Sequence, residues 1–217
     1  MTTAAPSLRF RTDLRYTDRA TKAGYIADKY ASILAGSVLD VGCDAAPLRT
    51  LVPRQDLYTG VDIRPDADIV VNLDRDDLPL ADRSFDTVLC TDVLEHLERC
   101  HAVFDELCRV AREHVIVSLP NPLRVLVQAL AAGRMTIKYY GLPADAPPDR
   151  HRWFFSHDDA VAFLTHRGQR NGFAIEQLDT EDADTSPAPP WPTRETGNVL
   201  NHPAVRHGTL WCVLRRK

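Results

Sequence analysis

The stretch SVLDVGCDAA, residues 37–46, decides the fold, because it is an apolar run that ends in a turn of small residues just before an expected helix. A strand, a tight turn and a helix N-terminus together form a cradle for a nucleotide, since the backbone of such a turn approaches the ligand closely. The dinucleotide pattern G-x-G-x-x-G is incomplete, because Asp44 stands where the glycine after Gly42 belongs. A second apolar run, YTGVD, ends at Asp62 about 20 residues downstream, where a ribose-binding carboxylate is expected. The two runs together predict a nucleotide-type cofactor site.

Further apolar runs continue a pattern of strands that alternate with helices. Strands are expected at 69–71, 85–90, 114–118, 173–178 and 209–214. Helices are expected at about 17–34, 99–112, 123–132 and 156–168. This alternation is typical of crossover units, and continuous apolar strands are typical of a parallel sheet that is buried on both faces. The sequence therefore predicts an α/β fold.

The composition favours a single domain over residues 1–217 and excludes several classes of function. The net charge of −4, with both signs interspersed, argues against binding to a phosphate backbone, so nucleic acid is not expected as a partner. Five cysteines form no C-x-x-C pair, and the odd count fits reduced thiols and a cytoplasmic location. No stretch approaches the roughly 18 apolar residues of a membrane span, so no membrane partner is expected. We expect a monomer or a homodimer.

Within this domain, the N-terminal helix at about 17–34 precedes a cofactor-binding core at about 37–120. An insertion at about 121–150 follows, and its second half is rich in tyrosine, proline and acidic residues. Loops longer than about 12 residues in compact domains often act as lids or binding loops, so we interpret the insertion as a lid over the acceptor. The fold resumes with a helix and strands at about 156–217, interrupted by a segment with five prolines at 181–208.

Several of these motifs resemble those of the class I S-adenosylmethionine-dependent methyltransferases. The matching elements are VLDVGC at 38–43, GVD at 60–62, residues 74–80 followed by SFD at 84–86, DVLEHL at 92–97, and RV at 109–110. They cover about residues 37–120 in the family's order and spacing. The resemblance implies a Rossmann-like sheet of seven strands, mostly parallel, with helices on both faces and an antiparallel last strand.

The same resemblance implies a set of cofactor-binding residues. These are Asp40, Gly42, Cys43, Asp44, Asp62, Ile63, Asp74, Arg75 and Asp92. Asp62 would accept both ribose hydroxyls, which suits an ionised carboxylate because it offers acceptors and no donor. Asp74 would bind the adenine amino group, and Asp92 would line the methionine end. The sequence departs from the family at Asp44 and Ala46, where many members have glycine.

His96 is the predicted catalytic residue. Methyl transfer from a sulfonium is an in-line displacement, so the protein must align the acceptor and exclude water. An acceptor hydroxyl or protonated amine must also lose a proton, which requires a base or a metal. His96 follows the fourth strand, at the edge where open parallel sheets bind their ligands. We therefore expect His96 to act as the base.

A divalent metal ion is a further expectation, with Asp92, Glu95, His96 and His151 as candidate ligands. Similar segments with a downstream histidine occur in metal-dependent relatives, including ubiquinone-pathway and small-RNA 3′-end methyltransferases. Carboxylate and imidazole ligands together suit a first-row metal or zinc, which would acidify a bound hydroxyl. A structural alternative stays open, because Asp92 and Glu95 also have the spacing of a capping box. His151 would equally serve to anchor the following helix.

The predicted activity is transfer of a methyl group from S-adenosylmethionine to an oxygen or nitrogen of a small-molecule acceptor. Tyr139, Tyr140 and Trp191 lie in loops and are candidates for contacts with that acceptor. The segment IVSLPNP at 116–122 and the insertion also resemble the MetW-like group of methionine biosynthesis. A cofactor-binding partner subunit with weak catalysis is therefore an alternative. RNA 3′-end methylation is a third reading, which lacks the basic surface expected of it.

Overall fold

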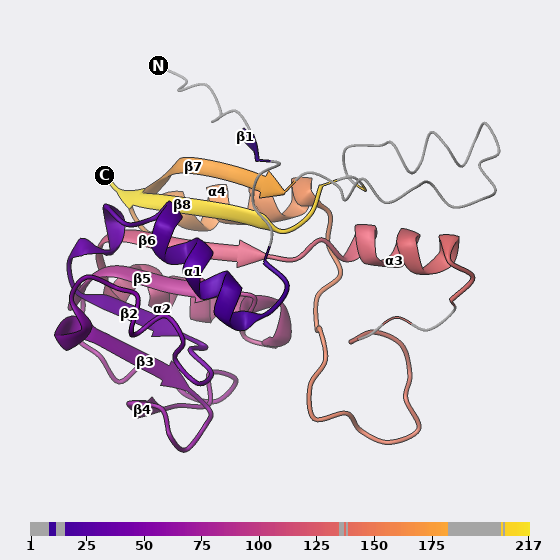
Figure 1. The fold of residues 1–217 in the computed structure, drawn as a ribbon, viewed down its shortest axis with the longest axis horizontal. Helices are drawn as coiled ribbons and strands as arrows, with labels where there is room; N and C mark the ends of the chain where they lie inside the picture. The colour runs from indigo at the N-terminus through magenta and orange to yellow at the C-terminus, as the bar shows by residue number, and fades with distance from the viewer. Residues whose placement is uncertain (1–8, 12–15, 135–136, 138, 182–204, 206) are drawn as a thin grey trace.

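The computed structural model describes residues 9–11, 16–134, 137, 139–181, 205 and 207–217. Within these residues, eight strands form one sheet in the order β1-β7-β8-β6-β5-β2-β3-β4 (Figure 1). The strands are β1 (Arg9–Arg11), β2 (Val38–Val41), β3 (Tyr58–Asp62), β4 (Ile69–Val70), β5 (Phe85–Thr91), β6 (Ala111–Leu119), β7 (Phe173–Glu181) and β8 (Leu210–Arg216).

Neighbouring strands run parallel everywhere except at β8, which is antiparallel to both β6 and β7. Strands β2 to β8 form the predicted seven-stranded, mostly parallel sheet, and the antiparallel last strand is confirmed. The eighth strand, β1, adds a short edge beside β7. The sequence analysis missed it because three residues are too few to show a periodic pattern.

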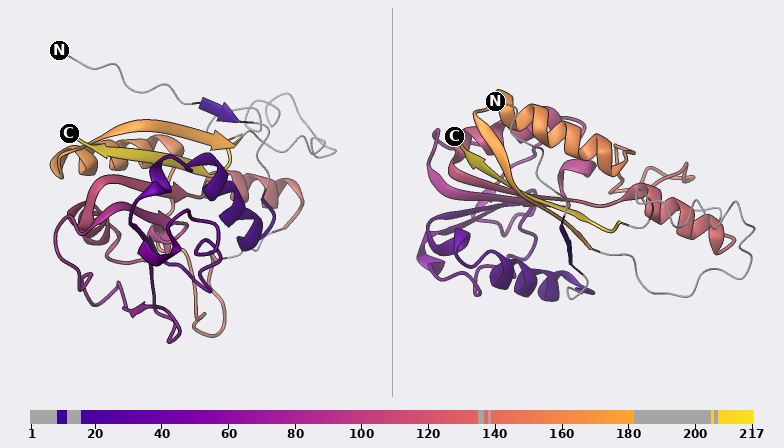
Figure 2. Two further views of the ribbon diagram at one scale, coloured as in Figure 1. Left: turned by 60° about the vertical axis from the view of Figure 1, so that its left-hand side comes forward. Right: turned by 90° about the horizontal axis from the view of Figure 1, so that it is seen from above.

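Four helices cover the sheet or extend from it. They are α1 (Arg19–Lys29), α2 (Cys100–Val110), α3 (Pro122–Ala131) and α4 (His157–Arg170), with short 3₁₀ turns η1 (Ile33–Ala35), η2 (Gln55–Leu57) and η3 (Leu94–His96). Helix α1 lies on one face of the sheet and α2 and α4 lie on the other, whereas α3 projects beyond the end of β6 (Figure 2). The helices on both faces agree with the predicted fold.

Local signals explain where the helices begin and end. Asp18 caps α1 through the backbone N–H of Thr21 in a capping box, and the helix ends at Lys29 rather than near residue 34. The side-chain oxygen of Asn121 caps α3 by accepting from the backbone N–H groups of Leu123 and Arg124. Helix α2 ends two residues earlier than predicted, because Ala111 already pairs with β5.

Two apolar clusters hold the layers together. One lies between the sheet and helices α2 and α4, and it includes the fully buried Phe104 and Leu164. The other lies between the sheet and α1, and it includes Tyr30 and Trp211, each 1% exposed. Because both faces are covered, the strand ends are the part of the sheet left open to a ligand.

Two remaining expectations concern regions outside the sheet core. Most of the proline-rich segment, together with its Trp191, falls outside the described residues. No helix among the described residues is long and apolar enough to cross a membrane.

Candidate active site

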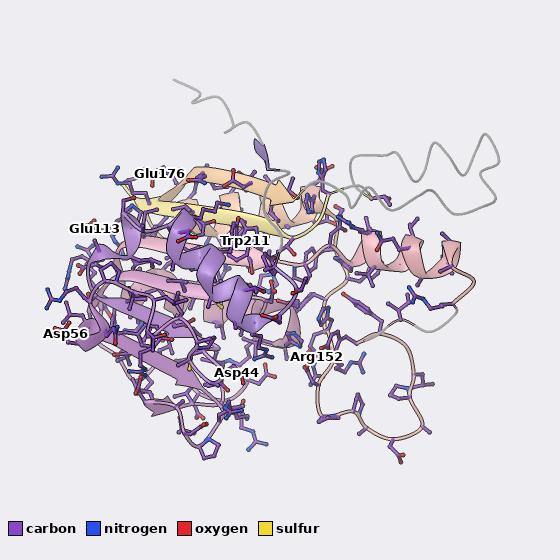
Figure 3. All side chains as sticks on the ribbon, viewed as in Figure 1. Asp44, Asp56, Glu113, Arg152, Glu176 and Trp211 are labelled. Atoms are coloured by element: carbon purple, nitrogen blue, oxygen red, sulfur yellow. The ribbon has the colours of Figure 1, made fainter. Side chains whose placement is uncertain are left out.

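A cavity of about 870 Å³ opens at the carboxyl ends of β2, β3 and β5. Helix α1 borders it on one side, and the segment 147–152, at the end of the insertion and just after it, borders it on another. Figure 3 labels two residues of the lining, Asp44 in the turn after β2 and Arg152 in the segment 147–152. The site therefore lies at the edge where open parallel sheets bind ligands.

Gly42 ends β2 in a left-handed conformation, with φ of 79°. A Cβ atom at this position would lie 2.2 Å from Cγ2 of Val93, so no other residue fits without moving the next segment. The N–H groups of Gly42 and Cys43 both donate to the carbonyl of Val61, at 2.8 and 3.2 Å. The turn is thereby fixed against β3.

Asp44 and Ala46 also adopt left-handed conformations, with φ of 50° and 52°. The backbone N–H of Asp44 donates to Oδ2 of Asp62 at 2.8 Å. Its carboxylate pairs with Arg19 at 2.5 Å and with Arg64 at 3.3 Å. The turn thus keeps backbone angles that glycine would favour, while Asp44 connects α1 to the loop after β3.

Asp40 lies beneath this turn and is 8% exposed. Its Oδ2 accepts a hydrogen bond from the hydroxyl of Tyr58 at 2.6 Å. Burial raises the pKa of Asp40 to about 6, and the hydrogen bond from Tyr58 opposes part of that shift. Burial also raises the pKa of the Cys43 thiol to about 12, so Cys43 is neutral at pH 7.

Asp62 ends β3 with both carboxylate oxygens facing backbone donors. Oδ2 accepts from Asp44 and Oδ1 accepts from the N–H of Arg64, at 2.8 and 3.1 Å. Each carboxylate oxygen has a second lone pair, so Asp62 keeps acceptor capacity toward the cavity. This geometry suits a group that binds hydroxyls.

Asp92 follows β5 and also holds a left-handed conformation, with φ of 55°. Its carboxylate accepts from the hydroxyl of Ser118 and from the ammonium of Lys22, both at 2.6 Å. The Lys22 side chain is only 13% exposed. Asp92 therefore forms an ion pair with Lys22 of α1. It does not form the capping box with Glu95 that their spacing allowed, since the N-cap of η3 is Val93.

Glu95, His96 and His151 each offer one ligand atom within 4.8 Å of the others. Glu95 is 2% exposed, and its Oε2 has no hydrogen-bond partner among the described residues. Burial raises the pKa of Glu95 well above its usual value, and the charge of Asp92 adds to this. Asp92 is not part of this group, so three of the four predicted metal ligands come together.

The insertion completes the site by folding onto η3. Oδ1 of Asp149 lies 2.6 Å from Nδ1 of His96, and the N–H of Arg152 donates to the carbonyl of Glu95 at 2.7 Å. The ring of Tyr139 stacks on His151 with centroids 4.8 Å apart. Burial, with a smaller effect from His96, lowers the pKa of His151 to about 4, so this imidazole is neutral at pH 7.

Residues 16–178 match the profile of a family described as the methyltransferase domain. The chain belongs to that family, the class I S-adenosylmethionine-dependent methyltransferases. No curated protein sequence matches this methyltransferase.

Solved structures with the same fold are distant in sequence. One is magnesium protoporphyrin IX methyltransferase (ChlM) from Synechocystis PCC 6803 with bound SAH, at 18% identity and a TM-score of 0.56, covering 91% of this chain and 83% of that chain. The PH0226 protein from Pyrococcus horikoshii OT3 has 18% identity and a TM-score of 0.57, with 95% and 94% covered. A SAM-dependent methyltransferase from Archaeoglobus fulgidus has 14% identity and a TM-score of 0.58, with 90% and 93% covered. At these identities the likeness concerns the fold of the methyltransferase.

The cavity of this methyltransferase fits a cofactor with an adenosine and an amino-acid end. Gly42 gives the close backbone approach that a side chain would block. Asp62 stands at the end of β3 with free acceptor capacity. Of the predicted cofactor-binding residues, those that line the cavity are Asp40, Gly42, Cys43, Asp44, Asp62, Ile63, Asp74 and Asp92. Arg75 is exposed and lies outside the lining.

Lys22 and Asp149 are two of the cavity residues that the sequence analysis of the methyltransferase did not identify. The sequence indicated a site role for Lys22 only weakly: it is a charged residue one turn before the buried Ile26 of an amphipathic helix. It gave no such indication for Asp149, because Asp149 lies in an irregular loop and meets His96 across 53 residues of sequence.

Proposed function

We propose that this methyltransferase transfers the methyl group of S-adenosylmethionine to an oxygen or nitrogen of a small-molecule acceptor. The observation that carries the proposal is a single cavity that joins the turn after β2 to the histidine pair of His96 and His151. The ring centroids of the two histidines lie 4.5 Å apart. One end suits the cofactor and the other suits an acceptor that must lose a proton.

The residues at the strand ends have distinct proposed tasks. Asp62 binds the ribose hydroxyls, and Asp74 binds the adenine amino group. Asp40, Gly42 and Cys43 surround the methionine end. When bound, the cofactor supplies an electrophilic methyl group on a sulfonium. The protein then contributes mainly by alignment and by excluding water from the displacement.

His96 takes the acceptor proton on Nε2. The hydrogen bond between Nδ1 and the carboxylate of Asp149 favours the tautomer with its proton on Nδ1, which leaves Nε2 basic. His96 is 24% exposed, so the ring is reachable from the cavity yet shielded from bulk water. Burial, with a further effect from the charge of Asp92, raises the pKa of Glu95 well above its usual value, which favours the protonated form of this side chain.

The same histidines support a second proposal, in which a divalent metal ion binds Glu95, His96 and His151. The unpartnered Oε2 of Glu95 favours it, since a buried carboxylate oxygen without a donor is costly. The lowered pKa of His151 leaves its imidazole neutral and available as a ligand. Such an ion would acidify an acceptor hydroxyl.

Calorimetric titration of the whole chain with S-adenosylmethionine and with its demethylated product tests the cofactor proposal. We expect saturable binding of both compounds, and no binding of either at millimolar concentration would contradict it. A panel of small hydroxyl and amine compounds, followed by release of the demethylated product, then tests turnover. Cofactor binding with no turnover on any compound would favour the alternative of a cofactor-binding partner subunit.

His96→Ala tests the proposed base. We expect it to lower kcat by at least about a hundredfold, the usual contribution of a general base, while cofactor affinity stays nearly unchanged. The matched control is His101→Ala, because His101 is exposed and does not line the cavity. Treatment with a chelator separates the two proposals: full activity of a metal-free preparation would contradict the metal ion and leave His96 as the base.

A further inference from the structure

We propose that Glu95, His96 and His151 bind the methyl acceptor through a primary ammonium group, so that the acceptor is an amine and not a hydroxyl compound or an anion. This inference rests on the proposed function and narrows its acceptor to one chemical class. It makes His151 an acceptor-binding residue beside the proposed base, His96. The hydrogen-bonding state of the three side chains and the charges around them carry it.

Oε2 of the buried Glu95 carboxyl group is open to a donor. The side chain is 1% exposed, and Oε2 has no hydrogen-bond partner among the residues that the structure describes. Oε1 lies 3.7 Å from Nε2 of His96, which is too far for a hydrogen bond. A polar atom buried in this way costs free energy until a donor reaches it. A cation that donates to Oε2 would also stabilise the ionised form that burial disfavours.

The two histidine rings present lone pairs as well. Nδ1 of His96 lies 2.6 Å from Oδ1 of Asp149, which keeps a proton on Nδ1 and leaves the lone pair on Nε2. The hydroxyl of Tyr140 donates its one proton to the carbonyl of Trp153 at 3.3 Å. Nδ1 of His151, 3.0 Å from that hydroxyl, is therefore the donor to its oxygen. Nε2 of His151 thus keeps its lone pair too.

Three acceptors close together match the three N–H donors of a primary ammonium group. Glu95, His96 and His151 each offer one atom within 4.8 Å of the others. A nitrogen that donates three hydrogen bonds of about 2.9 Å in tetrahedral directions holds its acceptors about 4.7 Å apart, which falls within this spacing. A hydroxyl group has one donor, so it would leave two of the three acceptors unsatisfied.

The charges around the cluster favour a cation over an anion. Carboxylate side chains outnumber lysine and arginine side chains among the residues that line the cavity. The carboxylate of Asp149 lies against His96. Of the two arginines that flank His151 in sequence, Arg152 has a side chain that is 41% exposed, and Arg150 is exposed as well. Water screens the charges of exposed groups, so these arginines compensate an anion at the cluster only weakly.

Binding as an ammonium agrees with the proposed role of His96 as the base. One proton of the ammonium passes to Nε2 of His96, and the neutral amine that remains has a lone pair and two N–H donors. Rotation about its C–N bond then presents the lone pair to the methyl group. A metal ion would instead occupy the lone pair of His96 that takes the proton. The ion of the second proposal and the ammonium therefore exclude each other.

The experiment titrates the complex of the whole chain and S-adenosylhomocysteine with methylammonium, the smallest primary ammonium probe, before and after treatment with a chelator. Methanol is the neutral probe with one donor, and tetramethylammonium is a cation without donors. NMR of isotope-labelled histidine rings follows Nε2 of His96 and of His151, assigned with the variants His96→Gln and His151→Gln. We expect methylammonium to shift both nitrogens saturably, with an affinity at least about tenfold higher than that of either other probe.

Glu95→Gln tests the carboxylate, since the amide keeps the shape of the side chain and removes its charge. Methylammonium should then bind at least about tenfold more weakly. Glu113→Gln is the matched control, because Glu113 is exposed, lies outside the cavity lining and changes the net charge equally. The affinity of that variant should stay within about twofold of the wild type.

Each outcome decides the inference. It is overturned if methylammonium shifts neither nitrogen, if another probe binds as tightly, or if Glu95→Gln binds methylammonium as the wild type does. A shift that disappears after chelation would assign the nitrogens to a metal ion and overturn it as well. The comparison of the three probes needs no variant, so it holds even if Glu95→Gln fails to fold. A chain that does not bind S-adenosylhomocysteine would instead contradict the proposed function.

Discussion

Asp44 and Ala46 show how much a single backbone angle constrains the cofactor turn. The sequence identified them as departures from the family pattern, and the structure gives both of them positive φ, at 50° and 52°. A side chain in this region normally costs about 1–2 kcal/mol. Asp44 gains an ion pair with Arg19 and another with Arg64, whereas Ala46 gains no polar contact from its methyl group. We therefore expect Ala46 to carry strain.

Ala46→Gly should raise the free energy of unfolding by roughly 1 kcal/mol, because glycine adopts this conformation without the clash of a Cβ. Urea unfolding followed by circular dichroism measures the change. The matched control is Ala27→Gly, since Ala27 packs partly buried against the same apolar cluster but lies inside α1. That control should instead lose about 1 kcal/mol. If Ala46→Gly lowers the free energy of unfolding as Ala27→Gly does, the turn is unstrained.

At the scale of elements, the insertion is attached to the sheet edge by few contacts. The N–H of Arg152 donates to the carbonyl of Glu95 and the indole N–H of Trp153 donates to the carbonyl of Leu97, both at 2.7 Å, and the side chain of Asp149 meets His96. Residues 141–150 are all exposed. Segments with few buried contacts open at low free-energy cost, so we expect residues 141–150 to open more readily than the sheet.

Asp149→Asn should loosen this attachment, because the amide loses the charge-assisted bond to His96. Hydrogen exchange followed by mass spectrometry should show the Arg152 amide exchanging several times faster than in the wild type. Asp145→Asn is the matched control: Asp145 is exposed on the same loop and has no polar partner among the described residues. Unchanged exchange in Asp149→Asn would mean that the backbone contacts alone hold the insertion.

At the scale of the whole molecule, one buried ion pair ties α1 to the far strand β7. Nζ of Lys29 lies 2.8 Å from Oδ2 of Asp179, and the two side chains are 2% and 3% exposed. The hydroxyl of Tyr25 accepts from the same ammonium at 2.7 Å. Because α1 also carries Lys22, this pair determines how one wall of the cavity sits on the sheet.

Lys29→Met should lower the free energy of unfolding by about 3 kcal/mol, since it leaves the carboxylate of Asp179 buried without its counter-ion. The double variant Lys29→Met with Asp179→Leu should recover most of that loss, because no charge is left buried. Chemical denaturation of the wild type and both variants measures this. A double variant as unstable as the single one would indicate that packing, and not the uncompensated charge, causes the loss.

The fold and the cofactor class could both be predicted from the sequence. Both follow from local patterns: apolar runs at strand spacing, and motifs from residue 38 to residue 110 that each span only a few positions. A strand of three residues, Arg9–Arg11, escaped because it has no such pattern. The sequence also located the departures at Asp44 and Ala46, although not the backbone angles that these residues adopt.

Which charged groups meet depends on how the chain folds. The sequence grouped Asp92 with Glu95 because they are three residues apart, whereas the structure pairs Asp92 with Lys22, 70 residues away. Asp149 reaches His96 from a loop of irregular structure in the same way. An ion pair depends on where side chains lie in space, and the distance between strands and loops is set by packing. The partners of the proposed catalytic and binding residues were therefore fixed by the fold of the whole chain.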